Sequence, residues 1–75
     1  MGRTGLDDHT YARCADLVRR FLAEEHVINN RGLRRLTGLN YDQAIKFFAR
    51  AVAGRVLIRI GSAGGTHYIR GPEDQ

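Results

Sequence analysis

The chain of 75 residues contains little that would stabilise a secreted or membrane-bound protein: it has one cysteine, one proline and no tryptophan. A lone cysteine cannot form an internal disulfide, so we expect a reducing, cytoplasmic setting, with nucleoid association if the source is bacterial. No stretch is long or apolar enough for a membrane span or a signal peptide. These absences argue against disulfide-stabilised and membrane-spanning classes of protein.

Catalytic and metal-binding patterns are also missing. His9, His26 and His67 lie far apart in the sequence, and no His-x-x-x-His or Cys-x-x-Cys spacing occurs. No carboxylate pair or Ser/His/Asp set falls on a recognisable scaffold. Residues 61–65 include three glycines, but no Gly-Lys-Ser/Thr follows, which excludes a P-loop. We therefore expect no enzyme, no cofactor and no metal site.

The charge of the chain points to a polyanionic partner. Formal net charge is +4 with an isoelectric point near 10.0. Of the twelve basic residues, only Lys46 is a lysine, and the rest are arginines. Arginine binds phosphates and guanine edges in a bidentate way, although a GC-rich genome would produce the same bias. At this length we expect one domain over residues 1–75, with frayed ends at about 1–6 and 71–75.

The first third of the chain predicts an amphipathic helix. Asp7 or Asp8 is placed to cap it, and residues 24–26 close it before a short extended piece at 27–28. Cys14 is interpreted as a small buried hydrophobe rather than a reactive thiol. The apolar stripe recurs at helical spacing: Tyr11, Cys14, Leu17, Val18 and Phe21.

A short second helix and a tight turn follow. Asn29 or Asn30 can cap this helix, in which Leu33 and Leu36 face inward. Gly38 suits the left-handed position that ends a helix. Two helices joined by so short a connection are typical of a helix-turn-helix.

The third helix has the strongest local signals. Asn40 caps it, and Gln43 three residues later completes a capping-box pattern. The buried stripe is Ala44, Phe47, Phe48 and Ala51. At 100° per residue, the outward face centres on Asp42, Lys46 and Ala49, flanked by Gln43 and Arg50 on one side and by Ile45 on the other.

The C-terminal part predicts a β-hairpin. Gly54 ends the third helix, and residues 56–60 then alternate as a strand that is apolar on one face and mixed on the other. The glycine-rich tip at 61–65 turns easily and can approach a phosphate or a groove floor closely. Thr66 to Arg70 return as the second strand.

Residues 28–70 resemble a bacterial winged helix-turn-helix. The turn LRRLTGLN at 33–40 is similar to the common Leu-Ala-x-Leu-Thr-Gly-Leu-Ser turn, and the hairpin resembles the Arg-x-Gly-x-Gly-x-Gly-Thr-x-Tyr wing of GntR-type regulators. The chain departs from the GntR-type pattern by carrying Tyr41 and Ile45 where arginine is usual, and Arg34 where a small alanine is usual. The resemblance implies a small α+β fold of three helices plus a C-terminal β-hairpin wing.

The resemblance further implies a small transcriptional regulator that binds double-stranded DNA sequence-specifically. The third helix would lie in the major groove, and the wing would meet the adjacent backbone or minor groove. Such readers often dimerise, so a homodimer is a further expectation, whereas the absence of an effector domain implies no small-molecule effector. The implied DNA contacts are Asn30, Arg31, Tyr41, Asp42, Gln43, Lys46, Arg50, Arg59, Gly64, Gly65, Thr66 and His67.

A winged helix can instead contact another protein, as an accessory subunit, an inhibitor or the N-terminal module of a larger protein. The placement of the arginines discriminates between these hypotheses. A continuous basic face built by Arg31, Arg34, Arg35, Arg50 and Arg59 with Lys46 favours DNA. A face split by acids, beside an apolar patch of Tyr41, Ile45 and Leu57, favours a protein partner.

Overall fold

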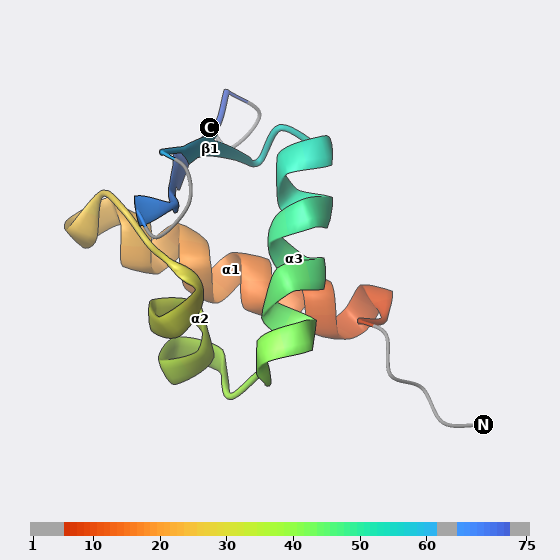
Figure 1. Cartoon of the computed structure of the whole chain (residues 1–75). Coiled ribbons are helices and arrows are strands. Elements are labelled where there is room, and N and C mark those ends of the chain that lie inside the picture. Colours follow the sequence, from red (N-terminus) through yellow and green to blue (C-terminus); the bar gives the residue numbers. More distant parts are fainter. Residues whose placement is uncertain (1–5, 62–64, 73–75) are drawn as a thin grey trace.

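The computed structural model describes residues 6–61 and 65–72, in which three helices precede a two-stranded antiparallel sheet. Helices α1 (Asp8–Glu25), α2 (Asn30–Thr37) and α3 (Tyr41–Ala53) are followed by strands β1 (Leu57–Ile60) and β2 (His67–Arg70). Helix α1 crosses behind α3, α2 lies below α1 in this view, and the hairpin sits near the upper end of α3 (Figure 1). The chain thus has the α+β arrangement of a small winged helix. No helix in the described ranges is long and apolar enough to cross a membrane.

Asp7 caps α1, as one of the two predicted alternatives, by accepting a hydrogen bond from the Thr10 amide at 2.7 Å. The apolar stripe of α1 is rotated from the predicted one: Leu17 is only partly buried and lies outside the core cluster, whereas Ala15 and Leu22 are buried. Helical spacing alone located the apolar stripe of α1. Packing against α2 and the hairpin determined which residues at the margins of that stripe are buried.

Side-chain caps begin the other two helices where the sequence predicted them. Asn29 caps α2 by accepting from the Gly32 amide, and Gly38 ends that helix in the left-handed conformation at φ 84°. The capping box of α3 is confirmed: the Gln43 amide donates to Asn40, and the Asn40 amide donates to the Gln43 side chain. These paired bonds satisfy amides that have no partner within the helix.

The hairpin is tied to the helices along β2. Ile58 lies opposite Ile69 in the β1–β2 register, and the backbones of Ile28 and Tyr68 exchange two hydrogen bonds of 3.0 and 2.8 Å. Opposite residues of an antiparallel pair point to the same face of a sheet. The mixed face of β1, which carries Leu57, packs on the helices, and the isoleucine face is turned away.

The core gathers around α3. Ala44, Phe47, Phe48 and Ala51 are all buried, as the sequence predicted. The Phe48 ring stacks on Tyr68 of β2 with centroids 3.8 Å apart and an interplanar angle of 6°. This contact joins α3 to the hairpin and sets the distance between them.

Two end segments are more ordered than the sequence suggested. Leu6 packs against the core cluster, and Gly71 is buried with its amide donating to the Val56 carbonyl at 2.8 Å. A side chain at Gly71 would collide with the backbone of Arg55, which explains the glycine. The remaining predicted ends, residues 1–5 and 73–75, lie outside the described ranges.

Helix α3 also ends at a glycine, but this glycine does not adopt the left-handed conformation that Gly38 adopts at the end of α2. Gly54 is the C-cap, as predicted, but its φ is −89°. The left-handed residue is instead Arg55, at φ 64°. A non-glycine side chain in this conformation is strained.

Candidate nucleic-acid interface

A furrow runs along one side of α3, between that helix, the N-terminal end of α2 and the inner face of the hairpin. It consists of two adjoining hollows of about 450 and 310 Å³ that share Ile45, Phe48 and Tyr68. The stacked rings of Phe48 and Tyr68 contribute to both hollows. The other lining residues are Asn29, Asn30, Arg31, Arg34, Tyr41, Thr66, Ala49, Val52 and Arg59.

Three arginines from two different elements border the furrow. Arg31 and Arg34 come from α2, and Arg59 comes from β1. No carboxylate residue lines either hollow among the residues that the structure describes. A groove with cations in both of its hollows and no carboxylate in its described lining attracts an anion.

Arg34 is held in a fixed orientation. Its Nε donates a hydrogen bond of 2.7 Å to Oδ1 of Asn30, one helical turn earlier, and its guanidinium carbon lies 5.5 Å from the centroid of the Tyr41 ring. Restraining a flexible cation before binding reduces the conformational entropy lost on binding. Arg34 was absent from the predicted contacts; the Asn30 to Arg34 spacing of four residues is the signal that could have found it.

The beginning of α2 adds backbone donors to the same furrow. The amides of the first turn of a helix have no acceptor within the helix, and one of them, that of Gly32, is satisfied by the Asn29 side chain. Within the part of the chain that the structure describes, the backbone amides of Asn30 and Arg31 donate to no acceptor, and the side chains of the same two residues line the furrow. This arrangement can hold a phosphate oxygen by charge and by hydrogen bonding together.

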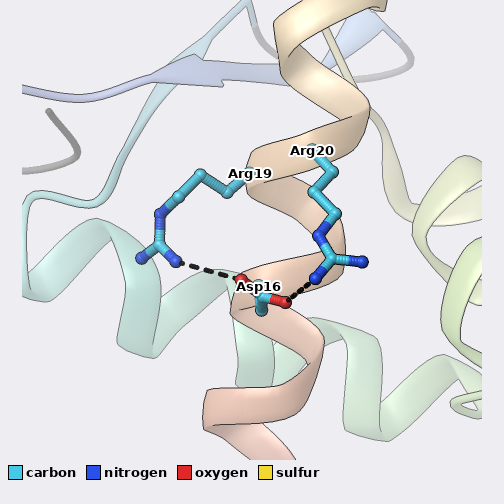
Figure 2. A network of polar contacts seen from close by, with 3 residues as sticks. All are labelled: Asp16, Arg19 and Arg20. Carbon is cyan, nitrogen blue, oxygen red and sulfur yellow. Dashed lines mark ion pairs between the residues drawn. The ribbon is translucent and has the colours of Figure 1, made fainter.

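Three arginines away from the furrow form ion pairs with acids. Arg19 and Arg20 of α1 both form ion pairs with Asp16, at 3.7 and 3.0 Å (Figure 2). On the flank of α3 that faces α1, Arg50 pairs with Asp8 at 2.9 Å and lies 4.2 Å from the centroid of the Tyr11 ring. Positive charge is therefore offset at Arg50 by Asp8 and partly offset at Arg19 and Arg20, which share the single carboxylate of Asp16.

The structure separates the predicted contacts into groups. Asn30, Arg31, Tyr41, Arg59 and Thr66 line the furrow, and exposed Asp42 and Lys46 belong to α3 outside its lining. The others lie apart from it: Gln43 serves the capping box, Arg50 is held at α1, and His67 shares the outer hairpin face with Ile58. The ring nitrogen Nδ1 of His67 is 2.9 Å from the Gly65 carbonyl, and Gly64 lies outside the described residues.

The criterion for a DNA partner, a continuous basic face, and the criterion for a protein partner, an apolar patch, are each met in part. Arg31, Arg34 and Arg59 gather at the furrow, but Arg35 lines a separate hollow against Phe21 of α1. The apolar patch expected for a protein partner is incomplete, because Leu57 is only 1% exposed. Tyr41 and Ile45 remain exposed on α3, at 58% and 46%.

Cys14 has no part in this interface. It is 1% exposed, and burial raises the pKa of its thiol above the ordinary value of 9.0, although the Arg13 charge and a hydrogen bond with Thr37 act in the opposite direction. Arg13 is a charged neighbour that the sequence interpretation overlooked. A protonated, buried thiol is a poor nucleophile.

The described residues contain no group of three or more His, Cys, Asp or Glu side chains arranged to hold a metal ion. Comparison of the chain with known protein families, curated proteins and solved structures returns no match. The furrow and its charges are therefore the basis for assigning a function.

Proposed function

We propose that this protein binds double-stranded DNA sequence-specifically, as a small transcriptional regulator. Helix α3 would enter the major groove, and the hairpin would contact the adjacent backbone or minor groove. The observation that supports this most strongly is the placement of Arg31, Arg34 and Arg59 around one furrow that no described carboxylate lines. The furrow would take the sugar-phosphate backbone between the helix and the hairpin.

Base recognition would come from the exposed side chains along α3. Tyr41 and Ile45 present apolar surface suited to a thymine methyl group, and Lys46 supplies a cation. Asp42 can accept a hydrogen bond from a cytosine amine. In this assignment the reading edge lies on the furrow side of α3, because Gln43 and Arg50 are committed to contacts within the protein.

The test is a titration of salt against binding to a mixed pool of duplex DNA, followed by selection of enriched sequences. Sequence-specific binding predicts a steep fall in affinity with salt and an enriched motif. Steep salt dependence without enrichment would contradict sequence specificity and leave an architectural role. Absence of binding at low salt would overturn the proposal.

Matched arginine variants make this test specific to the furrow. Arg31→Gln should lower the salt slope by about one and weaken binding to all sequences. Arg20→Gln is the control, since Arg20 is an exposed arginine of α1 that pairs with Asp16 and lies outside the furrow lining. Equal losses from both variants would show that net charge, rather than the furrow, determines binding.

A protein-contact module is the second candidate, supported by the exposure of Tyr41 and Ile45 on α3. Binding through this apolar pair would depend weakly on salt. Ile45→Lys would then abolish partner binding, whereas added positive charge should preserve or increase non-specific DNA affinity. If Ile45 instead contacts a thymine methyl group, Ile45→Lys should lower affinity for the selected sequence, so a loss of that affinity supports DNA reading and an unchanged or raised DNA affinity supports the protein-contact module.

A further inference from the structure

Arg34 is restrained at three points by uncharged groups. The Gly38 amide donates to its backbone carbonyl at 2.9 Å, its Nε donates to Oδ1 of Asn30 at 2.7 Å, and its guanidinium carbon lies over the Tyr41 ring, 5.5 Å from the centroid. The first contact fixes the backbone at the end of α2, and the other two limit rotation of the side chain. A half-buried cation is therefore held in one orientation before any ligand arrives.

The hydrogen bond to Asn30 determines which donors of Arg34 are left for a ligand. A guanidinium has N–H donors on Nε and on both terminal nitrogens, Nη1 and Nη2. Nε is used within the protein, and within the described ranges the guanidinium forms no ion pair. The two terminal nitrogens therefore remain as a fork, which matches two oxygens of one phosphate.

Asn30 adds a donor beside this fork. Its Oδ1 is occupied by Arg34, so the Nδ2 amide is the group of this side chain that is left to donate. Both side chains line the larger hollow of the furrow, whose described lining contains no carboxylate. A set of donors without a facing acid suits an acceptor that carries negative charge, as a phosphate does.

We propose that Asn30, Arg34 and Tyr41 form a clamp that holds one phosphate of the DNA backbone and fixes the position of α3 along the duplex, an inference that rests on the proposed function. Arg34 contacts the phosphate through its terminal nitrogens, and Tyr41 supports the guanidinium from one face. Asn30 is a positioning residue that acts through Arg34. Tyr41 is the first residue of α3 and is 58% exposed, so the clamped phosphate lies beside the beginning of the reading edge.

The clamp contributes to sequence selectivity without touching a base. Contacts to phosphates set the register of a protein on the duplex, and base contacts depend on that register. In a complex with unselected DNA, Arg34 meets phosphates in many orientations and gains little from being held in one. Loosening the clamp should therefore weaken binding to the selected sequence more than binding to the mixed pool. Anisotropy titrations with both DNAs measure this ratio, and equal losses would contradict the role in selectivity.

Asn30→Ala removes the restraint and keeps the charge. Asn29, rather than Asn30, caps α2, so the helix should form normally. We expect affinity for the selected duplex to fall about threefold to tenfold, because an unrestrained side chain loses more entropy on binding. The salt slope should stay unchanged, whereas Arg34→Ala should lower it by about one. In the Arg34→Ala background, Asn30→Ala should change affinity by less than about twofold. Additive losses would show that Asn30 acts on DNA directly, which would overturn its positioning role.

Chemical changes in the duplex distinguish a phosphate from a base. Replacing phosphates of the selected sequence one at a time by neutral methylphosphonates should reveal one position at which wild type and Arg34→Ala bind equally well, to within about twofold. Arg20→Ala is the control, because Arg20 pairs with Asp16 on α1, and it should bind as wild type does at every position. If the difference disappears instead when one guanine is replaced by an analogue without the ring acceptor of the major groove edge, Arg34 contacts a base and the phosphate clamp is wrong.

Proton exchange in the DNA-free protein, followed by nuclear magnetic resonance, tests the clamp independently of DNA binding. The Nε proton of Arg34 should exchange with solvent at least about fivefold more slowly than that of Arg35, the next residue, for which the described ranges show no such hydrogen bond. Asn30→Ala should remove this difference. Equal exchange rates in wild type would overturn the clamp even if the protein binds DNA. A protected Arg34 proton in a protein that binds no DNA would instead overturn the proposed function and, with it, the phosphate assignment.

Discussion

The arginines beside the two flanks of α3 are in opposite circumstances: Arg50 belongs to α3 itself, and Arg34 reaches the other flank from α2. On the flank that faces α1, Arg50 lies between the Asp8 carboxylate and the Tyr11 ring. On the furrow flank, Arg34 is held by neutral groups, the Asn30 side chain and the Tyr41 ring. The first cation is compensated, whereas the second keeps its full charge for an external anion. Residue type is the same on both flanks, and only the neighbours differ.

This difference explains why an arginine-rich composition is a weak guide to an interface. Surface ion pairs such as Arg20–Asp16 add little to stability, but they reduce the local positive potential. The furrow therefore attracts anions because the described acids lie outside its lining, mainly on α1, with Asp42 on α3. The distribution of carboxylates is as informative as that of arginines.

Truncating the aromatic residue on the furrow flank should have the largest effect. Phe48→Ala removes the ring stacked on Tyr68 and should cost about 3–5 kcal/mol, close to the whole stability of so small a domain. Urea denaturation followed by circular dichroism measures this loss. Phe47→Ala, on the α1 flank beside Tyr11, should cost a similar amount. A loss below about 1 kcal/mol for Phe48→Ala would show that the hairpin is not held by this stack.

Paired substitutions on the two flanks test the comparison directly. Arg34→Ala should weaken DNA binding and lower the salt slope by about one, because the cation faces no acid. Arg50→Ala should leave DNA affinity nearly unchanged and cost about 0–1 kcal/mol of stability, since its partner Asp8 is exposed. Fluorescence anisotropy at several salt concentrations measures both. A larger loss of affinity from Arg50→Ala would reverse the assignment of the two flanks.

A smaller effect is expected where α3 joins the hairpin. Arg55→Gly should stabilise the protein by about 1 kcal/mol, because glycine adopts the left-handed conformation without strain. Gly54→Ala is the matched control: at φ −89° with no close neighbour, it should change stability little. Thermal denaturation distinguishes them. Destabilisation by Arg55→Gly would mean that the arginine side chain makes a compensating contact.

The smallest effect concerns the pH dependence of stability at Cys14. Since burial raises the pKa of the folded thiol above 9.0, the unfolded chain loses this proton first as the pH rises. The protonated Cys14 thiol therefore makes its full contribution to the free energy of unfolding below pH 9.0. This contribution is lost as the pH rises through the pKa of the thiol in the folded protein. Denaturation of wild type and Cys14→Ala between neutral and alkaline pH isolates this contribution. Parallel pH profiles would contradict it.

Local signals predicted the elements of the fold well. The capping box at Asn40 and Gln43 and the left-handed Gly38 involve residues within a few positions of each other, so the sequence displays them directly. The stripe of α3 also follows from helical spacing. The stripe of α1 and the buried face of β1 were less predictable, because periodicity identifies two faces but does not say which one a neighbour covers.

The residues of the candidate interface likewise divide into those that the sequence identified and those whose placement depends on tertiary neighbours. Arg31 and Tyr41 were identified through the resemblance to a winged helix-turn-helix, and both line the furrow. Arg34 was named for the basic face but not among the contacts, and Arg50, a predicted contact, lies away from the furrow, because these placements depend on Asn30, Tyr41 and Asp8. Of these, the Arg50 pairing with Asp8 joins residues 42 positions apart, which no local pattern reveals.

The sequence by itself determined the helices, their caps, the hairpin and the excess of arginine, because these depend on backbone propensities, short-range hydrogen bonds and composition. Tertiary structure alone decided which arginines are compensated and which face of β1 is buried. The physical reason is that electrostatic compensation and burial act through space, between segments whose proximity is set only when the helices and the hairpin pack together.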